Sequence, residues 1–184
     1  MLGLFYLAVL ATVPLAGGRL TSLADLRLRK PGFALAAIVM QIAIISLLPE
    51  GSHNLHRAVH IASYVALGAF AWCNRRIAGV PIAALGGLLN FIAITANGGV
   101  MPADKDAIAS LPQAAKGDFA NSQVLAHPKL QFLGDVFATP PSWPLHNVFS
   151  VGDVVLLLGV AVLAHVACDS RLVPRRFAAA RVAA

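Results

Sequence analysis

Residues 149–168 read FSVGDVVLLLGVAVLAHVAC, a long apolar run that opens with a carboxylate, Asp153. Apolar runs of similar length recur at residues 1–17, 32–48, 58–73 and 79–96. Each is near the minimum length for a helix that crosses the hydrocarbon of a bilayer, at about 1.5 Å per residue. The five runs predict an all-α, polytopic membrane protein, a bundle of about five transmembrane helices forming one domain over residues 1–184.

The composition of the chain supports this prediction. Of its 184 residues 58% are hydrophobic and only 12% are charged, and the mean hydropathy is +0.76. An ordinary soluble domain of this size is much more polar. The formal net charge of +6 does not indicate a nucleic-acid partner, because the basic residues cluster beside the apolar runs instead of forming a stripe with interleaved aromatic residues.

The positions of the basic residues predict the orientation. Ten of the fourteen lie in alternate connections, within residues 18–31, 74–78 and 169–184. By the positive-inside rule these segments face the cytoplasm. The N-terminus is then outside, residues 97–148 form one long extracytoplasmic loop between the fourth and fifth helices, and residues 169–184 form a cytoplasmic tail.

Asp153 has two interpretations that the sequence leaves open. Ser150 lies three residues before it, so residues 150–153 resemble a capping box at the start of a helix. In the second interpretation Asp153 forms a reactive pair with Asp135, which lies in the apolar stretch FLGDVF. Two adjacent carboxylates, one ionised as base and one protonated as acid, perform the chemistry of aspartic peptidases. This requires residues 97–148 to fold back onto the helix ends.

Two asparagines mark a second candidate region. Asn90 and Asn97 are seven residues apart and therefore share a helix face, which leads into the stretch ANGGVMP. One interpretation is a glycine cap at the helix end, followed by a proline. In the other, Asn97, Gly98 and Gly99 present donors to a bound group, and Asn90 and Ser150 contribute further contacts.

The histidines do not show metal-ligand spacing, and no phosphate loop, dinucleotide fingerprint or G-x-S-x-G motif is present. We therefore expect no metal and no cofactor. His60 and Tyr64 are four residues apart on one helix face. We expect His60 to donate or accept a hydrogen bond within the bundle, with Asn90 or Gln41 as its partner.

Five segments carry a resemblance to a known family. They are GGRLTSLADLRLR, NRRIAGV, LLNFIAITANGGVMP, HPKLQFLGDVF and FSVGDVVLLLG, in this order along the chain. With them the whole chain resembles a bacterial multipass membrane family, the domain of unknown function 5317. The resemblance implies a location in the bacterial cytoplasmic (inner) membrane and supplies no activity.

A second, local resemblance concerns lipoprotein signal peptidase, a four-span membrane aspartyl peptidase. LGDVF and FSVGDVVLLLG are similar to its two aspartate motifs, and ANGGVMP is loosely similar to its asparagine motif. The resemblance implies Asp135 and Asp153 as the catalytic pair and Asn97 in support. The chain departs from the pattern in its five apolar runs and in Ser150, which stands where an asparagine is expected.

Two functional hypotheses follow from the sequence. The first is a non-catalytic integral membrane protein, a subunit or a partner-docking protein. The alternative is an intramembrane aspartyl-type hydrolase or peptidase that uses Asp135 and Asp153 at the outer membrane–water boundary. The expected partners are the lipid bilayer and either another membrane protein or a lipid-linked substrate.

Overall fold

The fold is that of a computed structural model, which describes residues 2–43, 53–111, 122–140, 142–143 and 146–173. Most of these residues are helical, and short strands occur between the fourth and the last long helix. In chain order the elements are α1 (Leu2–Leu15), η1 (Leu20–Asp25), α2 (Gly32–Ile42), α3 (His53–Cys73), α4 (Val80–Ala96), β1 (Met101–Pro102), α5 (Lys105–Ala109), β2 (Ser122–Gln123), η4 (Gln131–Leu133), β3 (Asp135–Ala138), β4 (Val148–Ser150) and α6 (Val151–Ala167).

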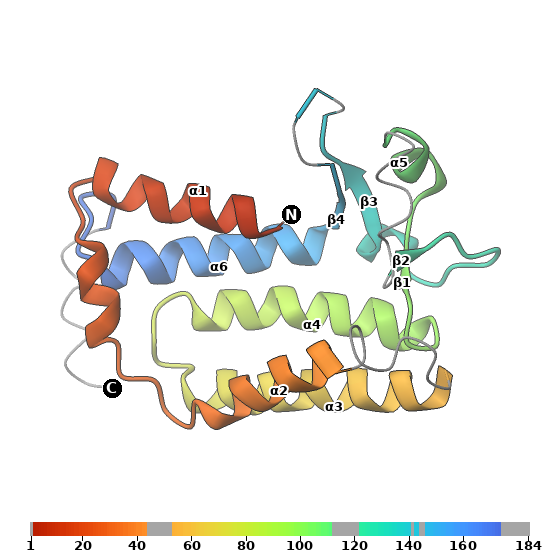
Figure 1. The fold of residues 1–184 in the computed structure, drawn as a ribbon, viewed down its shortest axis with the longest axis horizontal. Coiled ribbons are helices and arrows are strands. Elements are labelled where there is room, and N and C mark those ends of the chain that lie inside the picture. The colour runs from red at the N-terminus through yellow and green to blue at the C-terminus, as the bar shows by residue number, and fades with distance from the viewer. Residues whose placement is uncertain (1, 44–52, 112–121, 141, 144–145, 174–184) are drawn as a thin grey trace.

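The long helices lie side by side in one layer (Figure 1). α1 packs on α6, α6 packs on α4, α4 contacts α3, and α2 lies against α3. The strands and α5 gather at one end of this layer, where α4 ends and α6 begins. The opposite end holds the connections from α1 to α2 and from α3 to α4.

The prediction of a polytopic transmembrane bundle is wrong for the described part of the chain, in which no helix is both long enough and apolar enough to cross a membrane. α1, α2, α4 and α6 have 14, 11, 17 and 17 residues. α3 has 21 residues, but it begins with the polar sequence HNLHR. The lengths of the apolar runs overestimated the lengths of the helices, because some helices end before the apolar run does. The first helix, for example, ends before a turn at Gly17, which has a φ of 74°. The predicted spans were residues 1–17, 32–48, 58–73, 79–96 and 149–168.

The all-α prediction is also wrong, because the predicted loop of residues 97–148 contains strands. β1 pairs with β2 in parallel, and β3 pairs with β4 in antiparallel orientation. β4 continues directly into α6, so the β3–β4 pair ties the loop to the first turn of that helix. Residues 44–52, 112–121 and 174–184, which include part of that loop and most of the predicted tail, lie outside the described residues.

The closest packing in the layer is between α4 and α6. Gly86 lies against the backbone of Gly152 and Leu156, and Gly159 lies against the backbone of Ala83, so that a Cβ at either glycine would overlap with main-chain atoms. Small residues at these positions let the two helix backbones approach each other directly. This approach places the polar side chains of α4 against the N-terminus of α6.

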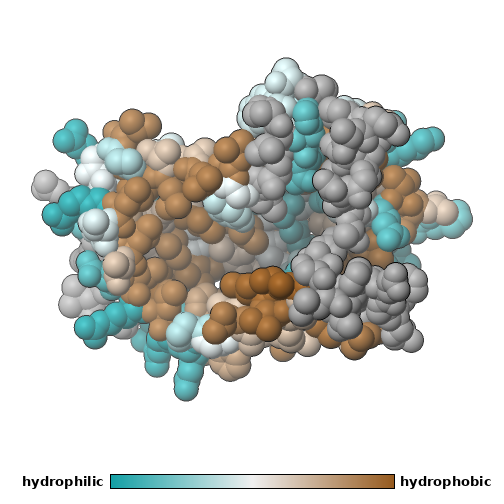
Figure 2. Space-filling view, in the orientation of Figure 1, coloured by the Kyte–Doolittle hydropathy of each residue, from teal (hydrophilic) through white to brown (hydrophobic). Residues whose placement is uncertain are grey.

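Large apolar side chains are exposed over much of the helical layer. They include Leu7 at 64% exposure, Leu35 at 63% and Val65 at 62%, on three different helices. Figure 2 shows apolar side chains spread across the helices, while hydrophilic ones gather at the two ends of the helical layer. Extended exposed apolar surfaces are, in general, found where proteins contact other proteins, membranes or ligands.

Candidate functional site

The first turn of α6 carries the predicted capping box. The Ser150 Oγ accepts a hydrogen bond from the Asp153 backbone N–H at 3.0 Å, and the Asp153 Oδ2 accepts one from the Ser150 N–H at 3.0 Å. Each side chain thus accepts a hydrogen bond from a backbone N–H at the start of the helix, where no helical carbonyl is available to accept it. The capping interpretation of Asp153 is confirmed.

Asn90 extends this cap across the helix interface. Its Nδ2 donates to the Asp153 Oδ1 at 2.8 Å, and its Oδ1 accepts from the Ser150 Oγ at 2.8 Å. Ser150 is fully buried and Asn90 nearly so. Gly152 makes room for the amide, because a Cβ there would overlap with the Asn90 side chain. Three of the predicted site residues therefore form one hydrogen-bonded group between α4 and α6.

Asp135 lies beside this group, on the loop segment. In the antiparallel β3–β4 pair it lies directly opposite Ser150, and it is buried, with 6% of its surface exposed. The Ser122 hydroxyl donates to its Oδ2. Burial raises the pKa of Asp135 to about 6, the Ser122 hydrogen bond opposes this rise, and the charge of Asp153 adds to it. The charge of one acid of the predicted pair therefore acts on the pKa of the other.

Two tyrosines face the acids from other helices. Burial raises the pKa of Tyr64, on α3, to about 12, and the charges of Asp153 and Asp135 contribute to this rise. Burial and the Asp153 charge also raise the pKa of Tyr6, on α1. The Tyr64 ring packs on those of His60 and Phe91, with centroids 5.2 and 5.3 Å apart. Both tyrosines are therefore near enough to the acid site for the charge of Asp153 to act on them.

Asn97, Gly98 and Gly99 end α4 with a glycine cap, as one interpretation predicted. Gly98 and Gly99 have φ of 74° and 100°, a region that favours glycine, and the Gly99 N–H donates to the Ile94 carbonyl at 2.9 Å. The Asn97 amide holds the backbone of Lys129 with two hydrogen bonds of 2.7 and 2.8 Å. Both amide atoms are therefore used to fix the loop segment.

A family model for a family of unknown function, DUF5317, matches residues 25–165. The chain belongs to this family. No curated protein and no solved structure matches it. The match to the family includes every residue of the candidate site except Tyr6, which precedes it.

Sequence reasoning missed several polar contacts that the fold creates. Ser122 carried no motif, and its role depends on a strand of two residues. Asn74 holds both the N–H and the carbonyl of Arg29, each at 2.8 Å. The only signal for it was an asparagine directly after an apolar run. Its contact with Arg29, 45 residues away, has no counterpart in sequence spacing.

His60 does not have the partners that the sequence suggested. Gln41 donates to Ser63 Oγ at 2.9 Å, and Asn90 is occupied by Asp153 and Ser150. Among the described residues the His60 Nε2 has no hydrogen-bond partner. Burial accordingly lowers the pKa of His60, because the charged imidazolium is the form that loses most hydration.

Proposed function

We propose that this member of the DUF5317 family is a non-catalytic, membrane-associated protein whose helical layer contacts lipid. The observation that supports the proposal most is the exposed apolar surface on α1, α2, α3 and α4, including Leu7, Leu35, Val65 and Leu88. Transfer of such side chains from water into an apolar medium is favourable by roughly 25 cal/mol per Å². The proposal requires lipid contact only and does not include the crossing of a bilayer by any described helix.

The hydrogen bonds of the acid site agree with a non-catalytic role. Each carboxylate oxygen of Asp153 already accepts a hydrogen bond, from Asn90 and from the Ser150 backbone. Asn97 is occupied by Ala93 and Lys129. These groups hold the loop segment and the two central helices together, and we propose that this is their function.

Vesicle flotation of the full chain tests the proposal. The wild-type protein should float with phospholipid vesicles, and the double variant Leu35→Gln/Val39→Gln on the exposed face of α2 should float less. The matched control is Lys105→Gln/Asp106→Gln, two exposed positions on α5. Wild-type protein that stays at the bottom of the gradient would contradict lipid contact and would favour a protein partner for the apolar surface.

A second candidate is an aspartyl-type hydrolase, favoured by the raised pKa of Asp135 beside Asp153. Groups whose pKa values are separated by their environments take the roles of acid and base. In this scheme the Asp153 carboxylate accepts a proton from a water whose oxygen attacks the substrate carbonyl. Asp135 in its protonated form then donates its proton to the leaving nitrogen as the carbon–nitrogen bond breaks, so that one water is consumed and a carboxylic acid and an amine are released. Return of the proton from Asp153 to Asp135 restores the starting state.

Isosteric substitutions separate the two candidates. The purified protein is incubated with quenched fluorescent peptides of apolar sequence, and cleavage is followed. A hydrolase requires that wild-type protein cleaves them and that Asp135→Asn and Asp153→Asn both abolish cleavage while the circular dichroism spectrum is retained. Cleavage that survives either substitution would exclude the aspartyl mechanism.

A further inference from the structure

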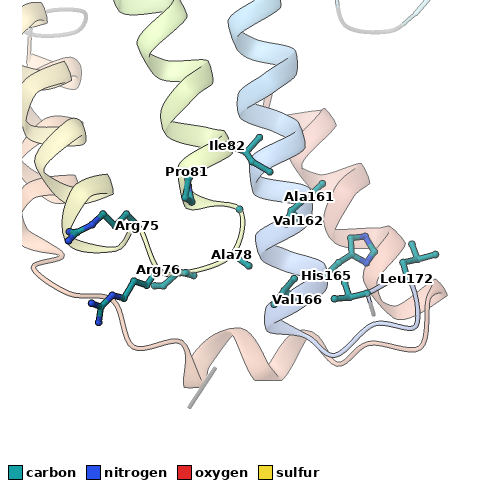
Figure 3. A pocket seen from close by; sticks show the side chains of 13 residues that line it. Arg75, Arg76, Ala78, Pro81, Ile82, Ala161, Val162, His165, Val166 and Leu172 are labelled. Carbon is teal, nitrogen blue, oxygen red and sulfur yellow. The ribbon is translucent and has the colours of Figure 1, made fainter. Parts of the chain in front are cut away.

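A second site lies at the ends of α4 and α6 that are remote from the acids. It is a cavity of about 610 Å³ between the α3–α4 connection, the start of α4, the C-terminal half of α6 and the segment after it. Figure 3 shows its walls: Pro81 and Ile82 from α4, Ala161, Val162, His165 and Val166 from α6, and Leu172 beyond. His165 is twelve residues after Asp153, about 18 Å along a helix, so this cavity is separate from the acid site.

The walls of the cavity are apolar, and its charged lining residues are two arginines, Arg75 and Arg76. No carboxylate is among the lining residues. His165 is buried, and its ring nitrogens lie 2.9 Å from the Thr12 Oγ1 and 2.7 Å from the Ser170 Oγ. An apolar cavity of this size with a few polar groups at one side is typical of a ligand site. Its chemistry suits a molecule with an anionic head and an apolar chain.

Arg75 is held in place by its surroundings. The Arg75 guanidinium lies over the Trp72 ring, 4.2 Å from its centroid, and donates to the Trp72 carbonyl at 2.8 Å. Arg76 also lines a small adjacent hollow together with Arg27 and Arg29. The buried Asn74 fixes the Arg29 backbone against the end of α3. Arg75 and Arg76 therefore place two basic side chains at the edge of the cavity, and Figure 3 shows their guanidinium groups pointing away from its apolar walls, toward the outside.

We propose that this cavity binds one anionic phospholipid, with an acyl chain along the apolar wall that α4 and α6 form and the phosphate at the outer edge, against Arg75 and Arg76. Guanidinium groups bind phosphate oxygens through paired, charge-assisted hydrogen bonds. The apolar wall formed by Ile82, Val162 and Val166 would make no favourable contact with a free phosphate ion, whereas an acyl chain would pack against it. This inference rests on the proposed function, because it requires that the protein is in contact with lipid.

Brominated lipids provide the test, because bromine on an acyl chain quenches a nearby tryptophan. The chain has two tryptophans, and Trp143→Phe leaves Trp72, which contacts Arg75, as the single reporter. In neutral detergent, brominated phosphatidylglycerol should quench Trp72 at a concentration at least tenfold lower than brominated phosphatidylcholine. Arg75→Gln/Arg76→Gln and the cavity-filling Ala161→Phe should each remove this preference.

The matched control is Arg57→Gln. Arg57 is exposed near the start of α3, about 24 Å along this helix from its last residue, Cys73, at 1.5 Å per residue, and its substitution should change the preference less than twofold. Equal quenching by both lipids, or an unchanged preference in the double arginine variant, would overturn the inference. Inorganic phosphate that displaces the lipid from wild-type protein, with Ala161→Phe still quenched normally, would assign the site to the ion alone.

The failure of this inference is distinguishable from the failure of the proposed function. A protein that floats with neutral and anionic vesicles alike, and shows no preference in the quenching assay, contacts lipid without a specific site. A protein that floats with neither fails at the level of lipid contact.

Discussion

At the scale of single residues, Asn90 on α4 links this helix to the first turn of α6. It is the only side chain among the described residues that bonds both members of the α6 capping box. The half-buried Asp153 carboxylate and the buried Ser150 hydroxyl both bond to its amide. Their unpaired burial would be unfavourable, because neither could recover hydrogen bonds to water.

We predict that Asn90→Ala lowers the free energy of unfolding by about 1–3 kcal/mol, the cost of leaving a buried polar group unpaired. Asn90→Asp should lower it further at neutral pH, because it places a second carboxylate against Asp153. Both values are measured by denaturant unfolding in detergent. An Asn90→Asp variant as stable as the wild type would show that Asp153 does not depend on the amide donor.

Because of Asp135, the stability of the folded protein should decrease as pH rises from about 4 to about 6. Its pKa is raised from 3.8 to about 6 in the folded protein, so between these values the folded state binds more protons than the unfolded state. Stability then falls as pH rises from about 4 to about 6 and is constant above. The fall is on the order of 3 kcal/mol, at about 1.4 kcal/mol per pKa unit.

The matched variant for this prediction is Asp135→Asn, which keeps an oxygen acceptor for Ser122 and does not titrate. Thermal unfolding from pH 4 to pH 7 should show a fall in Tm for the wild type that is absent or much smaller in the variant. The same fall in both proteins would assign the pH dependence to other groups.

At the scale of elements, the contact between α4 and α6 depends on glycines that face the neighbouring backbone. Gly86→Ala should destabilise the protein by about 1–3 kcal/mol, because the new Cβ would overlap with Gly152 and Leu156 and force the helices apart. Gly87→Ala is the internal control, since a Cβ there meets nothing within 4 Å. It should stabilise the helix by about 0.5–1 kcal/mol, and the two melting temperatures should therefore shift in opposite directions.

The elements also show what the sequence could predict. Five helices occupy the apolar runs, and the Ser150–Asp153 spacing and the Asn97-Gly98-Gly99 stretch predicted the two helix caps, because caps depend on neighbouring residues. The prediction that these helices cross a membrane was wrong, because hydropathy does not give the residue at which a helix ends. The strands β1 to β4 were missed, because they have two to four residues each and depend on pairing across the loop.

The candidate site shows the same division. Ser150 and Asp153 interact over three residues, and their spacing predicted the contact. Asn90 bonds to Ser150 although 60 residues separate them in the sequence. Ser122 bonds to Asp135 from β2, a strand of two residues. Asn90 could be suspected from the sequence, as a polar residue within an apolar run, whereas Ser122 could not. The partners of both are set by packing between distant segments, which a single sequence does not contain.

At the scale of the whole molecule, α1 forms one edge of the helical layer and packs mainly on α6. Its attachment has an apolar part, in which Val13 packs with Ala164 and Cys168, and a polar part. The polar part is His165, which lies between Thr12 on α1 and Ser170 in the segment after α6. One imidazole therefore joins the first helix to the chain beyond the last one.

Loss of this imidazole should loosen one edge of the molecule and leave the rest in place. We predict that His165→Ala lowers the free energy of unfolding by about 1–3 kcal/mol, because the buried Ser170 hydroxyl loses its partner and the contact with the exposed Thr12 is lost as well. Amide hydrogen exchange should accelerate over α1, while α2 and α3, which pack on each other, keep their protection. His127→Ala, a substitution in the loop segment, serves as the control. Exchange that accelerates equally in all helices would mean that α1 does not open separately and that the layer unfolds as one unit.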